Sequence, residues 1–224
     1  MSIVSVAWTF LASFLIALVV FSALERIAKW LLLRFALRKY RLEIAGAIGL
    51  AATPDQITLQ PTGVDPWNDR AAAGRLVLAV EREGFRSAGV FAIDEMPGLL
   101  VQLFAHPEEK LIGAVYEHPQ AGHWIDVVER RTDGTSTTWS SAPESGLDPR
   151  SGHLQVREPG AAPEALVARA RRERGPAPAE AVHPAEVEAL FERAYAEETA
   201  WRKGKCVSRE EMQRIERGME QAAA

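Results

Sequence analysis

The chain contains very little cysteine: Cys206 is the only one among 224 residues. A single cysteine excludes an intramolecular disulfide and the paired-cysteine motifs of zinc sites and thiol redox enzymes. The sequence also lacks a glycine-rich phosphate loop, a GxGxxG dinucleotide fingerprint and the GxSxG elbow of serine hydrolases. These absences remove the common enzyme signatures, so we predict a noncatalytic protein without a cofactor.

Acidic side chains outnumber basic ones over most of the chain. The protein has 26 basic and 30 acidic residues, a net charge of −4. Residues 25–41 carry six basic side chains and one acid, so the remaining 183 residues after them have a net charge of −9. Nonspecific nucleic-acid binding requires Lys and Arg to neutralise phosphates. We therefore expect no nucleic-acid partner.

What the sequence does contain is a long uncharged segment at its start. Residues Ile3 to Leu24 form a run of 22 residues without a charge. A bilayer core of roughly 30 Å needs about 20 apolar helical residues. A cleaved signal peptide would have a basic segment before a shorter apolar run, whereas only Met1 and Ser2 precede this one. The run predicts a single transmembrane helix at residues 1–24.

A basic collar follows the uncharged run directly. It consists of Arg26, Lys29, Arg34, Arg38, Lys39 and Arg41. Lys and Arg beside a span stay on the cytoplasmic side. We therefore predict an inner (plasma) membrane protein with its N-terminus outside and its C-terminal domain in the cytoplasm. The collar segment, residues 25–53, also has an apolar helical face that would contact either membrane lipid or a protein, and the sequence leaves both open.

The rest of the chain predicts an α+β domain. We expect a helix at residues 69–83 and strands near residues 88–93, 99–105, 111–118, 123–131 and 135–141. Asp133-Gly134 is a hairpin signal, and short links of this kind predict an antiparallel meander of about five strands. Residues 57–59 and 153–157 are two further short candidate strands. Residues 54–160 would hold the helix and sheet, and C-terminal helices in residues 161–224 would cover one sheet face.

One histidine cluster suggests a candidate metal site. His118 and His123 flank a predicted four-residue loop, and Asp126 follows closely in sequence. Imidazole and carboxylate groups are common metal ligands, and a site needs three or four of them to converge. Two exposed histidines beside a loop are the simpler interpretation of the same pattern.

Three short motifs carry a resemblance. They are Glu83-Gly84-Phe85 with Gly89, the turn Asp133-Gly134-Thr135, and Tyr195 and Trp201-Arg202 followed by Ser208-Arg209-Glu210-Glu211. Together they resemble uncharacterised bacterial proteins with an N-terminal membrane anchor and a small α+β domain. The resemblance implies a bacterial source and the fold above, and it implies no activity.

These observations predict a membrane-tethered binding or scaffold module, or an accessory subunit of a membrane assembly. It would contact membrane lipid and a protein partner at the cytoplasmic face. A small-ligand or lipid-binding sensor is the first alternative, with a pocket between sheet and helices. A metal-dependent enzyme that uses His118, His123 and Asp126 is the second.

Overall fold

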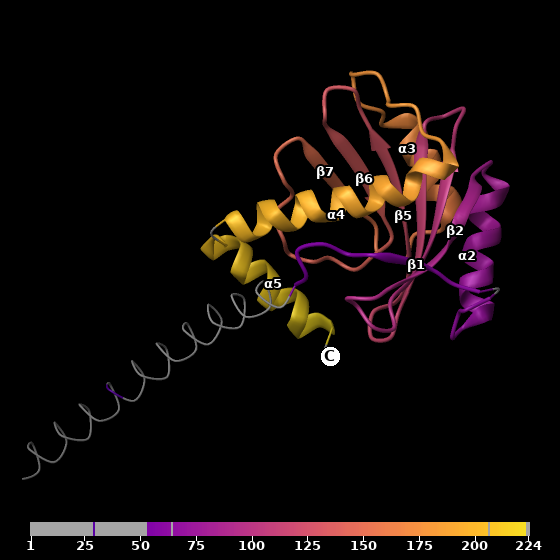
Figure 1. The fold of residues 1–224 in the computed structure, drawn as a ribbon. Coiled ribbons are helices and arrows are strands. Elements are labelled where there is room, and N and C mark those ends of the chain that lie inside the picture. The colour runs from indigo at the N-terminus through magenta and orange to yellow at the C-terminus, as the bar shows by residue number, and fades with distance from the viewer. Residues whose placement is uncertain (1–28, 30–52, 64, 206, 223–224) are drawn as a thin grey trace, which may run out of the picture. The chain divides into compact units, whose positions relative to one another are not determined.

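The computed structural model describes residue 29 and residues 53–63, 65–205 and 207–222. The chain divides into two units, Met1–Gly49 and Leu50–Ala224, and the second contains the domain described below (Figure 1). The predicted transmembrane run lies outside the described residues. Among the helices that are described, none combines the length and the apolar composition needed to cross a bilayer.

A seven-stranded mixed sheet forms the centre of the domain. Its strands are β1 (Leu59–Pro61), β2 (Arg86–Ile93), β3 (Leu100–His106), β4 (Leu111–His118), β5 (Gly122–Arg130), β6 (Ser136–Ser140) and β7 (His153–Arg157). They lie side by side in chain order. Strands β1 to β6 are antiparallel to their neighbours, whereas β7 runs parallel to β6. The predicted five-stranded, wholly antiparallel sheet is therefore wrong.

Both additional strands lie at the edges of the sheet and are short. β1 has three residues and β7 has five, too few for a clear alternating pattern to identify their place in the sheet. A parallel neighbour requires the chain to return to the same end of the sheet. Residues 141–152 make that return, so β7 begins beside the start of β6, with His153 opposite Ser136.

Within residues 53–222 as far as they are described, five helical segments accompany the sheet. They are α2 (Arg70–Arg82), α3 (Pro163–Arg172), the 3₁₀ turn η1 (Pro184–Glu186), α4 (Val187–Gly204) and α5 (Arg209–Ala222). Asp69 caps α2 by accepting a hydrogen bond from the Ala72 amide at 2.9 Å. Gly84 follows α2 with a φ of +94°, a conformation that favours glycine.

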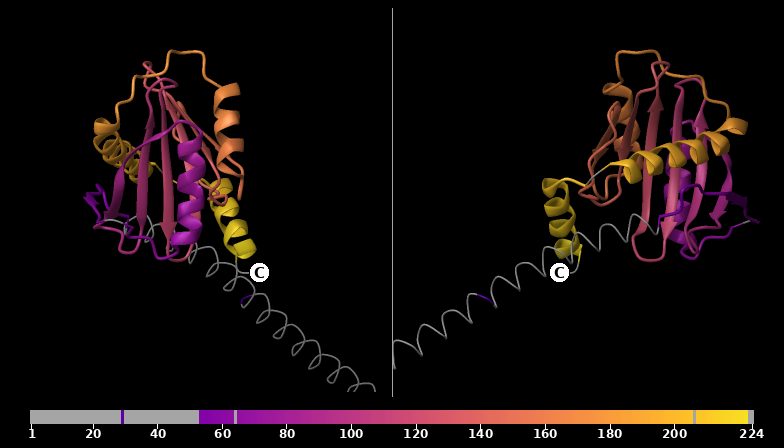
Figure 2. Two further views of the ribbon diagram at one scale, coloured as in Figure 1. Left: turned by 90° about the vertical axis from the view of Figure 1, so that its right-hand side faces the viewer. Right: turned by 60° about the vertical axis from the view of Figure 1, so that its left-hand side comes forward.

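The helices cover both faces of the sheet, as the left view of Figure 2 shows. On one face, α2 and α3 pack on an apolar cluster that includes Phe104, Val115 and Trp139. On the other face, α4 packs on Val101, Leu103 and neighbouring residues. The prediction that the C-terminal helices share one face is wrong. The physical reason is visible in β3, whose seven residues are all buried and therefore need cover on both sides.

Candidate functional site

The apolar layer beneath α4 ends part of the way across the sheet. It consists mainly of residues from β1 to β4 and side chains of α4, with Ile57, Val182 and, from β5, Val128. Beyond β4, the side chains on this face are mostly polar. We call this set the polar face, and it comprises Asp126, Arg130, Ser136, Thr138, Ser140, His153, Gln155 and Arg157. The same strands are apolar on the opposite face, where Ile125, Val127 and Trp139 belong to the core beneath α3.

One row of the polar face brings opposite charges onto neighbouring strands. Ala114 of the apolar layer lies opposite Asp126, Asp126 lies opposite Ser140, and Ser140 lies opposite Arg157. Adjacent strands are about 4.8 Å apart, so Asp126 and Arg157 are separated by roughly 10 Å of backbone. Ser140 lies between them. No sequence pattern indicates this row, because it depends on the pairing of three strands.

Asp126 is an unusual carboxylate in this row. Asp126 as a whole is half-buried, but its Oδ1 atom is fully buried. This atom has no hydrogen-bond partner among the described residues. Burial raises the pKa of Asp126 from its ordinary value of 3.8 to about 6. The Ser140 and Tyr116 hydroxyls donate hydrogen bonds to the Asp126 side chain. These bonds and the Arg157 charge oppose that shift without cancelling it. Desolvation of the charged form is therefore the dominant effect at this carboxyl.

Arg157 has no carboxylate partner among the described residues. Its Nη1 donates to the Pro143 carbonyl at 2.8 Å, and its Nη2 donates to Gln155 Oε1 at 3.1 Å. Both acceptors are neutral. The guanidinium is thus oriented by two bonds, while its charge is left without an ion pair.

Aromatic side chains border the charged row. Tyr116 and Trp124 lie opposite each other on β4 and β5, and their rings stack at 4.7 Å with 13° between the planes. Phe191 from α4 packs against Tyr116 at 6.3 Å. Burial and the adjacent Asp126 raise the pKa of Tyr116 well above its ordinary value, so its hydroxyl remains protonated. Asp126 therefore lies beside both a hydroxyl and an aromatic surface.

At the other end of the polar face, the polar side chains around His153 are hydrogen-bonded to one another. His153 Nε2 lies 2.6 Å from Arg150 Nη2 and its Nδ1 lies 2.7 Å from Ser136 Oγ. Arginine only donates, so Nε2 accepts and Nδ1 carries the proton of a neutral ring. Burial and the nearby Arg150 charge lower the pKa of His153, which agrees with that tautomer. Arg150 also pairs with Glu197 of α4 at 3.2 Å.

The structure does not bring the three predicted metal ligands together. His123 lies opposite Glu117, on the α2 side of the sheet, whereas Asp126 lies on the α4 side. His118 shares a face with Asp126, but it is four residues away from the position opposite Asp126, or about 13 Å along the strand. In residues 53–222, leaving out positions 64 and 206, no group of three metal-binding side chains converges.

Glu117 has a different role, which the sequence analysis did not identify. Its carboxylate accepts the Asn68 and Asp69 amides, both at 2.8 Å, and lies 3.0 Å from His123 Nε2. These hydrogen bonds lower the pKa of Glu117 against the opposing effect of burial. The carboxylate therefore attaches the segment before α2 to β4. In the sequence, the only indication of this contact is that Glu117 and His123 are six residues apart, on either side of a predicted hairpin loop.

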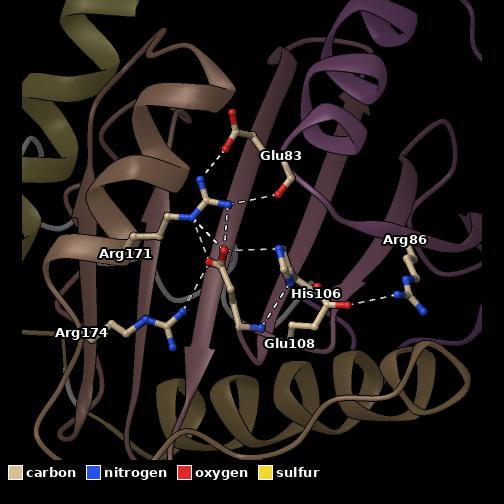
Figure 3. A network of polar contacts seen from close by, with 7 residues as sticks. Glu83, Arg86, His106, Glu108, Arg171 and Arg174 are labelled. Atoms are coloured by element: carbon tan, nitrogen blue, oxygen red, sulfur yellow. Dashed lines mark hydrogen bonds and ion pairs between the residues drawn. The ribbon is translucent and has the colours of Figure 1, made fainter.

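A second polar network lies on the opposite side of the sheet, where α2 and α3 end (Figure 3). Arg171 contacts Glu109 at 2.9 Å and Glu83 at 2.6 Å, and His106 Nε2 lies 3.4 Å from Glu109. The Arg171 hydrogen bonds lower the pKa of Glu109. All these groups are paired, so the network acts as a connection between α2, α3 and the β3–β4 turn.

Of the predicted basic collar, only Lys29 lies among the described residues, and its side chain is exposed. The remaining five collar residues lie outside them. They are Arg26, Arg34, Arg38, Lys39 and Arg41.

Comparison of the chain with known protein families, curated proteins and solved structures finds no significant match. The resemblance to bacterial membrane-anchored α+β proteins therefore stays a prediction.

Proposed function

We propose that this protein is a noncatalytic sensor domain that binds a small polar ligand on the polar face beneath α4. The observation that carries the proposal is the row Asp126, Ser140 and Arg157, in which two opposite charges share one face without an ion pair. This function is the first alternative drawn from the sequence, and the polar face favours it over a pure scaffold.

An unpaired buried polar atom raises the free energy of the folded protein. Most buried polar atoms in proteins are hydrogen-bonded. Leaving one unpaired costs about 1–3 kcal/mol. Asp126 Oδ1 carries such a cost. A ligand that donates an N–H or O–H group to this oxygen would recover that free energy.

The place of action is proposed from the sequence. Residues Ile3 to Leu24 are uncharged, and six basic residues follow them. We propose that this segment attaches the domain to lipid at the cytoplasmic face of the plasma membrane. Ligand binding would then be reported to a membrane-associated partner.

The test is a thermal-shift screen of the full-length protein in detergent against a library of small polar metabolites. A ligand at 100 times its Kd stabilises by about 2.7 kcal/mol, which corresponds to roughly 5–10 °C for a domain of this size. We expect at least one compound to produce such a shift.

Matched variants locate the binding site. Asp126→Asn and Arg157→Gln should abolish the shift. Glu164→Gln and Arg172→Gln are the controls, because both residues are exposed on α3 at the opposite face, and they should keep it. A screen without any stabilising compound, or a shift that persists in both site variants, would refute the proposal.

A second candidate function is the binding of an extended segment from a partner protein. β7 is an edge strand, and no strand in the described part of the chain pairs with its outer side. Alternate residues of a parallel edge strand, here Gln155 and Arg157, direct their backbone groups outward. Leu154 on the same strand is 56% exposed. Added strands bind such edges through main-chain hydrogen bonds. Gln155→Pro would remove one outward N–H and should weaken capture of the partner from membranes, while Glu164→Gln should not.

A further inference from the structure

We infer that the outer edge of β7 binds a second copy of this chain, with the two β7 strands antiparallel and Gln155 opposite the partner's Gln155. This inference rests on the second candidate function, the open edge of β7, and names its partner. The paired strands would join the two seven-stranded sheets into one continuous sheet.

The opposite edge of the sheet, β1, is closed to such pairing. Its register with β2 turns the backbone groups of Leu59 and Pro61 outward. The Leu59 amide already donates to Glu192 Oε1 of α4 at 2.8 Å, and Pro61 has no N–H to donate. Proline and short strands are common means of protecting a sheet edge from unwanted pairing. β1 therefore offers no free outward N–H to an added strand.

β7, at the other edge of the sheet (Figure 1), keeps most of its outward groups free. Its register with β6 turns the backbone groups of His153, Gln155 and Arg157 outward. The His153 amide donates to the Arg150 carbonyl at 2.9 Å. The amides of Gln155 and Arg157 have no hydrogen-bond partner within the described part of the chain. This edge therefore has donors and acceptors ready for another strand.

The free backbone groups of β7 match one another about a two-fold axis at Gln155. Each Gln155 amide would donate to the partner's Gln155 carbonyl. Each Arg157 amide would donate to the partner's His153 carbonyl, and the His153 amide, which is already bonded, would not be needed. Both free N–H groups of β7 would thus be paired. The contact is isologous and closes at two copies, which is the commonest kind of protein oligomer.

The same register brings apolar side chains together on the α3 side of the sheet. Leu154 would lie opposite the partner's Val156. Leu154 is 56% exposed, the largest exposed fraction among the large apolar side chains that the structure describes. Val156 is half-buried and packs against the core beneath α3. Two symmetric Leu–Val contacts would therefore remove Leu154 from water in both copies.

On the α4 side, the register opposes no like charges. Gln155 would face the partner's Gln155, and an amide side chain can both donate and accept. Arg157 would face the partner's His153, whose ring is neutral because its Nε2 accepts from Arg150. Arg150 is itself paired with Glu197 at 3.2 Å. A segment from an unrelated protein would not require β7 to complement itself in this way, so the match favours a second copy.

The first test is disulfide cross-linking of the full-length protein in detergent, with Cys206→Ser removing its only cysteine. Residues of a hydrogen-bonded antiparallel pair have Cα atoms about 5.5 Å apart, which suits a disulfide. Gln155→Cys should therefore form a linked dimer under mild oxidation. Arg157→Cys is the register control, because its two copies would lie about 13 Å apart along the strands. Glu164→Cys, exposed on α3, is the control for random collision, and neither control should link at a comparable rate.

The second test measures the mass of the detergent-solubilised protein by light scattering over a range of concentrations. Gln155→Pro removes the outward N–H, whereas Gln155→Ala keeps it. We expect a two-chain mass for the unaltered protein and for Gln155→Ala. Gln155→Pro should raise the dimer Kd by about ten-fold or more, because each dimer loses two hydrogen bonds. Urea unfolding of the proline variant shows whether it is folded, and the cross-linking result stands without it.

The outcomes separate this inference from the edge function on which it rests. Gln155→Cys that links no faster than Glu164→Cys, or a dimer equally tight in folded Gln155→Pro, would refute the second copy as the partner. If the protein is a monomer but captures another protein through the Gln155 amide, this inference fails and the edge function stands. If the protein is a monomer and no capture depends on that amide, both fail.

Discussion

Replacement of Asp126 by Asn should stabilise the protein at neutral pH. Asn has nearly the same shape as Asp and carries no charge, so the change removes the desolvation cost of the ionised carboxylate. The pKa of Asp126 is raised from 3.8 to about 6. Each pKa unit corresponds to 1.36 kcal/mol. The rise of the Asp126 pKa from 3.8 to about 6 therefore sets an upper value of about 3 kcal/mol for the gain in unfolding free energy. We expect about 2 kcal/mol, because the residue is only half-buried.

The sign of the pH dependence follows from proton binding. Between pH 4 and pH 6 the folded protein retains the Asp126 proton, whereas the unfolded chain releases it. Stability from this group therefore falls as pH rises through that window and is constant above it. The difference between Asp126→Asn and the unaltered protein should be about 2 kcal/mol at pH 7.5 and should shrink toward zero near pH 4.

The assay is urea unfolding of the full-length protein in detergent, followed by tryptophan fluorescence from pH 4 to pH 8. Asp133→Asn is the matched control with the opposite sign. Asp133 is exposed in the β5–β6 turn, and its pKa is lowered by two hydrogen bonds from Thr135. Its replacement should lower stability at neutral pH and have no effect at pH values below its folded pKa. An Asp126→Asn protein that is less stable at pH 7.5, or shows the same difference at every pH, would refute the reasoning.

Three further predictions concern stability, each measured by urea unfolding at pH 7.5. Glu129→Ala should cost about 3–5 kcal/mol, because it leaves the buried Arg131 without its partner at 2.9 Å; a loss below 1 kcal/mol would contradict this. Gly84→Ala should cost about 1–3 kcal/mol, since φ is +94° and the added Cβ would lie 2.8 Å from His106 Nε2, and an unchanged midpoint would contradict it. Glu117→Gln should destabilise by about 1–3 kcal/mol by weakening the attachment before α2, with faster amide exchange at the start of α2; unchanged exchange there would contradict the assigned role.

Local features of the sequence led to several correct positions within a fold that was otherwise wrong. The Asp133-Gly134 pair does occupy the turn between β5 and β6, where Gly134 has a φ of +81°. The helix expected at residues 69–83 corresponds to α2, which begins after its Asp69 cap. Both depend on residues within a few positions of each other, which is the range that composition and periodicity report.

The candidate site could not be predicted from such local patterns. His118, His123 and Asp126 are close along the chain, and for that reason they were the predicted metal ligands. Strand alternation places His123 on the face opposite Asp126. The relevant neighbours of Asp126 are Ser140 and Arg157, which are 14 and 31 positions away. Their proximity requires β7 to join β6 in parallel, and the polar linker between the two strands has no periodic pattern from which this pairing follows.

By itself the sequence determined the uncharged N-terminal run, the basic collar, the acidic balance of the remainder and the local turns that separate the central strands. These follow from side-chain chemistry and short-range backbone preferences. The tertiary structure alone decided that helices cover both faces of a seven-stranded sheet and that Asp126 and Arg157 share one row without pairing. Such an arrangement depends on contacts between distant segments, whose free energies include burial and loop closure and are not visible in any local stretch of residues.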